Sequence, residues 1–220
     1  MDQFIREVDE EYRRERAAEI WRRYSGLIVG VAFVVVAGVG GWRYYEHREE
    51  GRAQEAASRY EDALRLSREA KPEEAEKTLS SLASEAPAGY RLLARFRLAA
   101  EQGRQAPLEG AKAYDTLAGD ASVDPAMRDL ARLRAAMLRA DTPEASAADR
   151  ELERLATPTN PWRHTARELL GLSGLKRGEM ETAGRWFDQI AADRDSPQGL
   201  RSRLEIYTAL VAGGPIQTTQ

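Results

Sequence analysis

The sequence contains no cysteine, which excludes disulfide bonds, thiolate chemistry and zinc sites built on cysteine. It has two histidines, His47 and His164, and neither has a second histidine three or four positions away, so no paired-histidine metal motif is present. The glycine motifs that bind phosphate in nucleotide-dependent enzymes are also missing. We therefore expect neither a metal nor a cofactor.

The sequence also has no strong excess of positive or negative charge. After residue 50, basic and acidic residues nearly balance, and no basic stripe with interleaved aromatic residues is found, so the electrostatic footprint of nucleic-acid binding is absent. A Ser-His-Asp set can be drawn with His164 and Ser173 or Ser196, but no nucleophile elbow or glycine-rich oxyanion loop surrounds either serine. We predict a protein that is not an enzyme and has no small-molecule substrate. A hydrolase would need a nucleophile that the sequence does not display.

Long hydrophobic runs are absent with one exception. The seventeen residues from Ser25 to Gly41 carry no charge, and as a helix they would span roughly 25 Å, at the short end of what a bilayer core requires. Aromatic residues, which prefer the headgroup level, flank the run: Trp21, Tyr24, Trp42, Tyr44 and Tyr45. The pattern predicts one transmembrane helix over residues 25–45 with interfacial aromatic belts. A core helix of a soluble domain is the alternative.

The charges beside this run predict its orientation. Five arginines precede it from residue 13 on and three follow it by residue 52, which places residues 1–24, a charged helical segment, in the cytoplasm and the rest across the membrane. A cleavable signal peptide is the competing interpretation, because Gly38-Val39-Gly40 is a small-x-small triplet. The stretch before the run is longer than a usual charged leader, so we expect an uncleaved anchor.

Small residues line one face of the predicted membrane helix. Gly26 and Gly30 form a GxxxG motif, and Ala37 and Gly41 continue on nearly the same face. Small side chains let a second helix approach closely in a membrane, so this face is a hypothesis for helix packing.

Residues 46–212 have the pattern of helices throughout. Alternating β-branched runs are missing, Ala, Leu, Arg and Glu dominate, and Pro and Gly residues such as Gly103 and Pro107 separate segments with apolar positions three and four apart. Typical apolar stripes are Leu92, Leu93, Phe96, Leu98 and Ala99, and Leu130, Leu133, Met137 and Leu138. The pattern predicts a chain of helical hairpins. Residues 213–220 have no apolar periodicity, and we expect a disordered tail.

One segment has the layout of a tetratricopeptide repeat unit. Between about residues 164 and 197, a first helix carries Leu170-Gly171, Gly178 forms the turn, Ala183 and Phe187 lie in a second helix, and Pro197 follows it. Small residues let the two helices approach, and the large ring fills the gap between them. The unit near 56–89 matches too, with Ala63, Ala75, Leu79, Leu82 and Pro87.

The units near 90–123 and 125–158 are degenerate, so an unrelated helical bundle is the alternative to repeats. A further amphipathic helix, with Leu200, Leu204, Tyr207 and Leu210, is predicted to cover the end of the array. The predicted fold class is all-α: a single N-terminal transmembrane helix followed by a tetratricopeptide-like helical-hairpin solenoid with a C-terminal capping helix.

Three segments carry a family resemblance. Gly41-Trp42-Arg43-Tyr44-Tyr45 closes the apolar run; Tyr90 precedes Leu93-Ala94 and Leu98-Ala99; and the last repeat has Trp162, Leu170-Gly171, Lys176-x-Gly178, Ala183 and Asp195-Ser196-Pro197. In these segments the chain resembles the YfgM-like family, ancillary subunits of the bacterial SecYEG translocon with a tetratricopeptide-like domain. The resemblance implies a bacterial inner-membrane anchor and a periplasmic domain. It also implies association with the SecYEG translocon and contact with a periplasmic prolyl-isomerase-like chaperone.

Two functional hypotheses follow. In the first, the chain is a scaffold at the Sec translocon, and the first helices of its hairpins bind a chaperone or an emerging protein; the candidate groove residues are Tyr60, Arg68, Arg95 and Glu168. In the second, an envelope-assembly or cell-division coordinator binds peptidoglycan machinery through the same repeats.

Overall fold

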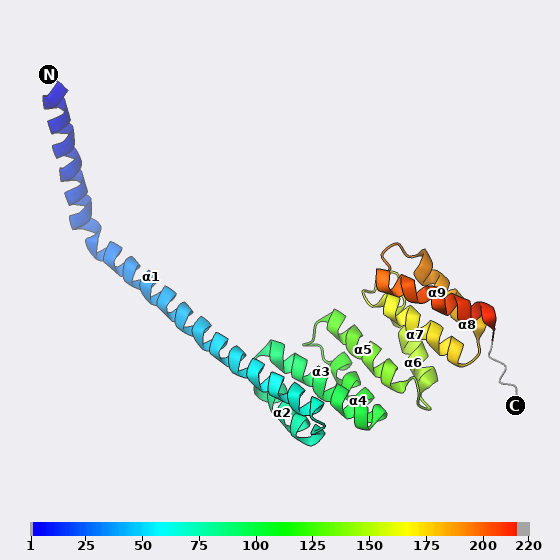
Figure 1. Ribbon diagram of the computed structural model, residues 1–220. Helices are drawn as coiled ribbons and strands as arrows, with labels where there is room; N and C mark the ends of the chain where they lie inside the picture. Colours follow the sequence, from blue (N-terminus) through cyan, green and yellow to red (C-terminus); the bar gives the residue numbers. More distant parts are fainter. Residues whose placement is uncertain (1, 215–220) are drawn as a thin grey trace. The chain divides into compact units, whose positions relative to one another are not determined.

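A computed structural model describes the backbone of residues 2–214; for residues 2–20, Ser25 and Ile28 it describes no side chain. The predicted tail at 213–220 therefore lies mostly outside the described residues. Within residues 2–214 the chain forms nine α-helices and no strand, so the all-α prediction is confirmed (Figure 1). The chain divides into two compact units, Met1–Glu55 and Ala56–Gln220.

Helix α1, Asp2–Arg68, makes up the first unit and continues into the second without a break at residue 25 or 46, where the sequence predicted segment boundaries. In the first unit the apolar side chains are exposed all around the helix, from Leu27 at 66% to Phe33 at 74% and Val39 at 58%. Among the described residues, which omit the side chains of Ser25 and Ile28 inside the run, no helix offers an apolar stretch long enough to cross a membrane.

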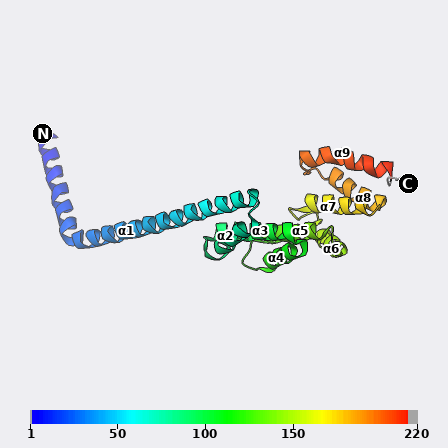
Figure 2. The same ribbon diagram turned by 60° about the horizontal axis from the view of Figure 1, so that its bottom comes forward.

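The second unit consists of helical hairpins in chain order. The end of α1 pairs with α2, and the remaining helices are α2 (Pro72–Glu85), α3 (Ala88–Gln105), α4 (Pro107–Gly119), α5 (Pro125–Arg139), α6 (Ala145–Leu155), α7 (Arg163–Lys176), α8 (Met180–Ala192) and α9 (Gln198–Gly213). From α2 onward each helix packs against the next, as in a solenoid. We call α1, α3, α5, α7 and α9 the first helices, and α2, α4, α6 and α8 the second helices. In Figure 2, α4 and α6 lie below α3 and α5.

Local chemistry explains where these helices start and stop. Proline occupies the start of α2, α4 and α5, where its missing N–H costs nothing. The Asp124 carboxylate accepts a hydrogen bond from the Ala126 N–H at 2.9 Å and caps α5. Gly178 has a φ of 75°, the left-handed conformation that the short turn between α7 and α8 requires.

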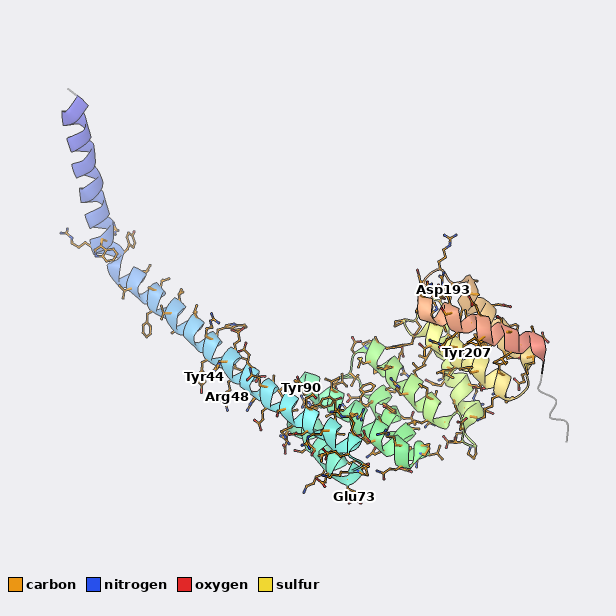
Figure 3. The ribbon with its side chains drawn as sticks, in the orientation of Figure 1. Tyr44, Arg48, Glu73, Tyr90, Asp193 and Tyr207 are labelled. Carbon is orange, nitrogen blue, oxygen red and sulfur yellow. The ribbon has the colours of Figure 1, made fainter. Side chains whose placement is uncertain are left out.

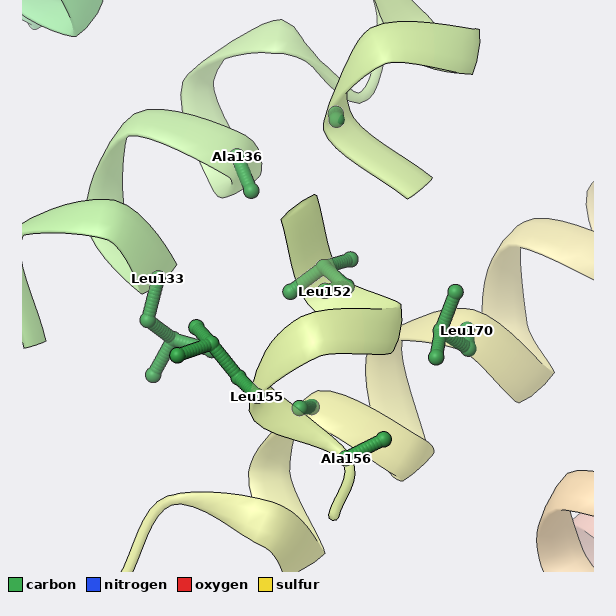
Figure 4. Packing of buried hydrophobic residues seen from close by; sticks show 8 residues of the cluster. Leu133, Ala136, Leu152, Leu155, Ala156 and Leu170 are labelled. Carbon is green, nitrogen blue, oxygen red and sulfur yellow. The ribbon is translucent and has the colours of Figure 1, made fainter. Parts of the chain in front are cut away.

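The core is a series of small clusters rather than one large one, because each helix reaches only its neighbours. The cluster in Figure 4 joins Leu133 and Ala136 of α5, Leu152 and Leu155 of α6, and Leu170 of α7. Three similar clusters serve the other hairpins, and their most buried large side chains are Leu79, Leu82, Leu117, Phe187 and Ile190.

The predicted packing of the last repeat is confirmed. A Cβ on Gly171 would lie 2.3 Å from the Phe187 ring, and one on Gly174 would lie 3.1 Å from the Ala183 backbone nitrogen. Phe187 and Ala183 are fully buried. The glycines of α7 therefore let α8 approach, and the Phe187 ring fills the space between the two helices.

The hairpin of α3 and α4 corrects one expectation. The sequence pattern predicts a break between segments at Gly103, but Gly103 lies inside α3. A Cβ on Gly110 of α4 would lie 2.3 Å from the Gly103 Cα, so the two backbones are in contact at this point. This glycine pair supports close packing of the hairpin that looked degenerate in sequence, because neither residue has a side chain to hold the helices apart.

Helix α9 covers the end of the array as predicted. Leu200 and Leu204 are buried against α8 in the cluster of Phe187 and Ile190. The outer side of α9 is not covered, since Ile206 is 62% exposed and Leu210 is 48% exposed.

Candidate functional site

Exposed large hydrophobic residues of the second unit occur only on first helices, as far as its described residues show. They are Leu93 on α3, Met137 on α5, and Ile206 and Leu210 on α9. The apolar spacing of the sequence places Leu93 and Met137 in the stripes of amphipathic helices, but they are 46% and 43% exposed. The neighbouring helices therefore cover only part of each apolar stripe and leave these two side chains partly open to solvent.

A set of apolar and basic positions, some exposed and some partly buried, recurs with helical spacing on three successive first helices. On α5 the residues are Leu130, Arg134 and Met137, one face by their spacing of four and three, while Leu133 and Ala131 on either side enter two different core clusters. We define the first-helix face as these three residues together with Leu93, Arg97 and Arg104 of α3 and Leu169, Leu172 and Lys176 of α7.

A small apolar pocket opens between α5 and α7. Its volume is about 130 Å³, and Met137, Leu169 and Leu172 line it together with Leu152 of α6. An apolar cavity of about 150 Å³ holds one benzene-sized group, so this pocket has the size for a single apolar side chain. Three charged residues, Lys176, Asp141 and Asp149, also line the pocket. Lys176 pairs with Asp141, and Asp149 pairs with Arg177 at 2.6 Å, so these charges are neutralised within the chain.

A larger cavity, about 380 Å³, lies among α4, α5 and α6 and has a different character. Its charged side chains pair with one another: Arg132 reaches Glu151 at 3.4 Å, and Arg139 pairs with Asp115. Because these charges neutralise each other within the chain, the cavity does not require an ionic ligand. It is the weaker of the two candidates.

The four predicted groove residues lie on α1 (Tyr60 and Arg68), α3 (Arg95) and α7 (Glu168), and no hydrogen bond or ion pair among the described residues joins any two of them. Tyr60 is half-buried and packs on Tyr90 with ring centroids 6.4 Å apart. Arg68 is exposed and ends α1. Arg95 forms an ion pair with Asp120 at 2.8 Å.

Glu168 of α7 accepts hydrogen bonds from Arg203 at 2.8 Å and Tyr207 at 3.0 Å, both on α9. Arg95 and Glu168 are thus engaged in contacts inside the chain. No pattern in the sequence marks Arg134, Met137, Leu169 or Leu172 as binding residues. Their exposure is set by which sides of α5 and α7 the neighbours cover.

Serine and histidine do meet in the structure. His164 of α7 and Ser196, in the loop after α8, lie with Nδ1 and Oγ 3.3 Å apart, and the His164 Nε2 atom is 3.7 Å from the Asp193 carboxylate. Figure 3 labels Asp193 in this loop. Ser173, the other serine considered, instead donates a hydrogen bond to Asp149 at 3.1 Å.

The geometry of this cluster serves packing. The buried Ser196 hydroxyl donates its proton to the Ile190 carbonyl at 2.6 Å, so the imidazole Nδ1–H is the donor to Ser196 Oγ and cannot act as its base. The contact fixes the loop between α8 and α9 against α7.

Charges around the loop set two pKa values. Burial, and then the nearby Arg163 charge, lower the pKa of His164. Hydrogen bonding from Arg163, the largest cause, lowers the pKa of Asp193 despite partial desolvation. The neutral histidine and the ionised aspartate are therefore the forms that the folded chain favours.

Neither a metal site nor a packed glycine face is found among the residues that the structure describes. No group of three potential ligands is placed to hold a metal ion. A Cβ on Gly26, Gly30 or Gly41 would have nothing within 4 Å, so these positions of the GxxxG hypothesis are open in the single chain.

Successive hairpins, glycine-mediated crossings and a capping helix define a helical-hairpin solenoid. The model of the tetratricopeptide repeat-like domain family matches residues 19–207, and the chain belongs to that family. No curated protein and no solved structure matches the chain. The family and the exposed first-helix face define a scaffold for protein–protein interaction.

Proposed function

We propose that the chain is a non-enzymatic scaffold, held in a bacterial inner membrane by a single N-terminal helix with the N-terminus in the cytoplasm. Its repeat domain, on the periplasmic side, binds proteins at the Sec translocon. The observation that carries the proposal is the first-helix face, with its partly exposed apolar side chains and a side-chain-sized pocket. Apolar side chains that gather around a pocket on a protein surface are a typical feature of interaction sites.

The membrane part of the proposal rests on α1. Its apolar side chains are exposed on all sides between Leu27 and Val39, and water is an unfavourable surrounding for such a surface. The belt residues are exposed as well, with Trp21 at 60% and Trp42 at 71%. Lipid chains would cover the apolar side chains of this part of α1, and the headgroup layer would accommodate the aromatic rings.

The translocon and the prolyl-isomerase-like chaperone enter through the resemblance of residues 41–45, 90–99 and 162–197 to the YfgM-like family. Membrane anchoring supports this proposal physically. A domain tethered beside a channel meets its partners at a high effective concentration, so individually weak contacts suffice. A shallow face with one small pocket is suited to such contacts.

Membrane attachment is tested by fractionation. We expect the full chain in the pellet after cell breakage and ultracentrifugation, resistant to high salt and released by detergent. Recovery of the full chain in the supernatant without detergent would contradict the anchor.

The partner is tested by cross-linking in intact cells. A photoreactive residue placed next to Trp42, followed by mass spectrometry, is expected to capture translocon subunits. Capture of division or peptidoglycan-synthesis proteins without translocon subunits would favour the second hypothesis, an envelope-assembly or cell-division coordinator. Capture of no protein by the chain would overturn the scaffold itself.

A further inference from the structure

Charge is divided between the two kinds of helix. The first helices α3, α5 and α7 carry eleven basic and three acidic residues between them. The second helices α2, α4, α6 and α8 carry five basic and eleven acidic residues. This division is invisible in the overall composition, because the two sets nearly cancel.

Part of this division stabilises the solenoid itself. Arg132 and Arg139 of α5 reach acidic residues of the second helices, Glu151 and Asp115. Arg163 and Arg167 of α7 bind Asp193 at 2.8 and 3.3 Å. These arginines are occupied and do not account for the positive charge on the first-helix face.

Three of the remaining arginines, Arg97, Arg104 and Arg134, lie on that face. Arg134 is exposed and has no ion-pair partner among the described residues. Arg104 is 67% exposed and shares the buried Glu101 carboxylate with Arg97. Because one carboxylate faces two guanidinium groups, the cluster on α3 keeps a net positive charge.

Apolar and basic groups therefore alternate on the same surface. Arg134 precedes Met137 by one helical turn on α5, and Met137 lines the pocket between α5 and α7. On α3, Leu93 lies one turn before Arg97. A partner that fits must offer an apolar side chain for the pocket and negative charge for Arg134 and the arginines of α3.

We infer that the first-helix face binds acidic peptide segments with a single large apolar side chain, which enters the pocket between α5 and α7 while flanking carboxylates pair with Arg134 and the arginines of α3. The inference rests on the proposed protein-binding function and specifies the chemistry of the bound segment. Electrostatic attraction brings the acidic segment to the face, and the pocket contributes the short-range selectivity.

The test uses the full chain in detergent and a fluorescein-labelled peptide of about twelve residues, with one leucine flanked on both sides by glutamates, followed by fluorescence anisotropy. We expect saturable binding that weakens as NaCl rises, because salt screens exposed charges. A peptide with lysine in place of glutamate, and one with serine in place of leucine, are expected to bind at least about tenfold more weakly, which corresponds to about 1.4 kcal/mol.

Two charge reversals on the protein form a matched pair. Arg134→Glu places a negative charge on the first-helix face and is expected to weaken binding about tenfold, through lost attraction and new repulsion. Arg150→Glu makes the same change at an exposed position of the second helix α6 and is expected to leave binding unchanged. Both positions are exposed, so the two variants are expected to share the wild-type circular dichroism spectrum.

A complementary swap completes the test, since the lysine peptide is expected to bind Arg134→Glu more tightly than it binds the wild type. Equal binding of the acidic and lysine peptides, or equal losses in the two variants, would overturn the inference. Tighter binding of single-stranded RNA or of anionic vesicles than of the acidic peptide would also overturn it. If no peptide binds while the cellular cross-linking still captures a partner, the inference fails and the scaffold stands.

Discussion

Gly171 of α7 lies against the ring of Phe187, so close that a Cβ would stand 2.3 Å from the ring carbon Cε1. Phe187 has no exposed surface, and its other side stacks on Tyr207 with ring centroids 5.0 Å apart. The packing of α7, α8 and α9 against one another thus depends on the absence of a side chain at Gly171.

Gly171→Ala is expected to lower the free energy of unfolding by about 1–3 kcal/mol, the usual cost of overpacking a core. Denaturation in urea, followed by circular dichroism, measures the change. Gly184→Ala on α8 is the control, because its Cβ would meet Val211 at an ordinary 3.5 Å and alanine favours helix. If Gly171→Ala is as stable as the control, the close packing at this crossing is wrong.

Glu168 links α7 to α9 through Arg203 and Tyr207, and its carboxylate is only 13% exposed. Glu168→Gln keeps the shape but removes the charge, and we expect a loss of about 1–2 kcal/mol in unfolding free energy. The control is Glu181→Gln, which removes an exposed pair with Arg185 inside α8 and is expected to change little.

This comparison also separates two roles for Glu168. If Glu168→Gln strengthens binding of the acidic peptide without affecting stability, because a repelling carboxylate is lost, Glu168 belongs to the groove as the sequence predicted. We expect the opposite result, a loss of stability with binding retained.

The pH dependence of stability is expected to report on His164. Its pKa in the folded chain lies below the ordinary 6.5, because burial and Arg163 disfavour the imidazolium. Between that lowered value and about 6.5, the unfolded chain binds more protons than the folded one, so stability falls as pH falls through this window. Asp193 and Asp195 favour the imidazolium but do not outweigh burial.

We expect His164→Gln to flatten the change in unfolding free energy between pH 7 and pH 5, which for one proton has a slope of at most about 1.4 kcal/mol per pH unit. Urea denaturation at several pH values measures it. His47→Gln alters the other histidine, which is exposed on α1, and serves as the control. A wild-type slope that persists unchanged in His164→Gln would contradict the assignment.

The proposed anchor predicts a response to charge. Val34→Arg combined with Val35→Arg places two guanidinium groups at the centre of the apolar run, where each costs about 2.5–3.5 kcal/mol for membrane insertion. We expect the variant to leave the membrane pellet, whereas Val34→Leu with Val35→Leu stays in it. An arginine variant that remains fully in the pellet would argue that another part of the chain holds it there.

Local patterns determined a large part of this fold. Apolar spacing, prolines and glycines predicted helices throughout, the packing of Gly171, Ala183 and Phe187, and the covering helix with Leu200 and Leu204. These features depend on residues close in sequence, so the helical spacing of apolar residues is enough to predict them. The tethering of the chain remains a prediction from the single run between Ser25 and Gly41.

The tertiary structure decided which sides of the first helices are covered. Periodicity showed an apolar stripe on α3 and on α5, but only the placement of the neighbouring helices leaves Leu93 and Met137 exposed and buries Leu133 and Ala136. The same placement engages Arg95 and Glu168 in ion pairs and leaves Arg134 without one in the described chain. Exposure and charge pairing depend on helices that are distant in sequence, and for that reason the candidate binding face emerged only from the packed solenoid.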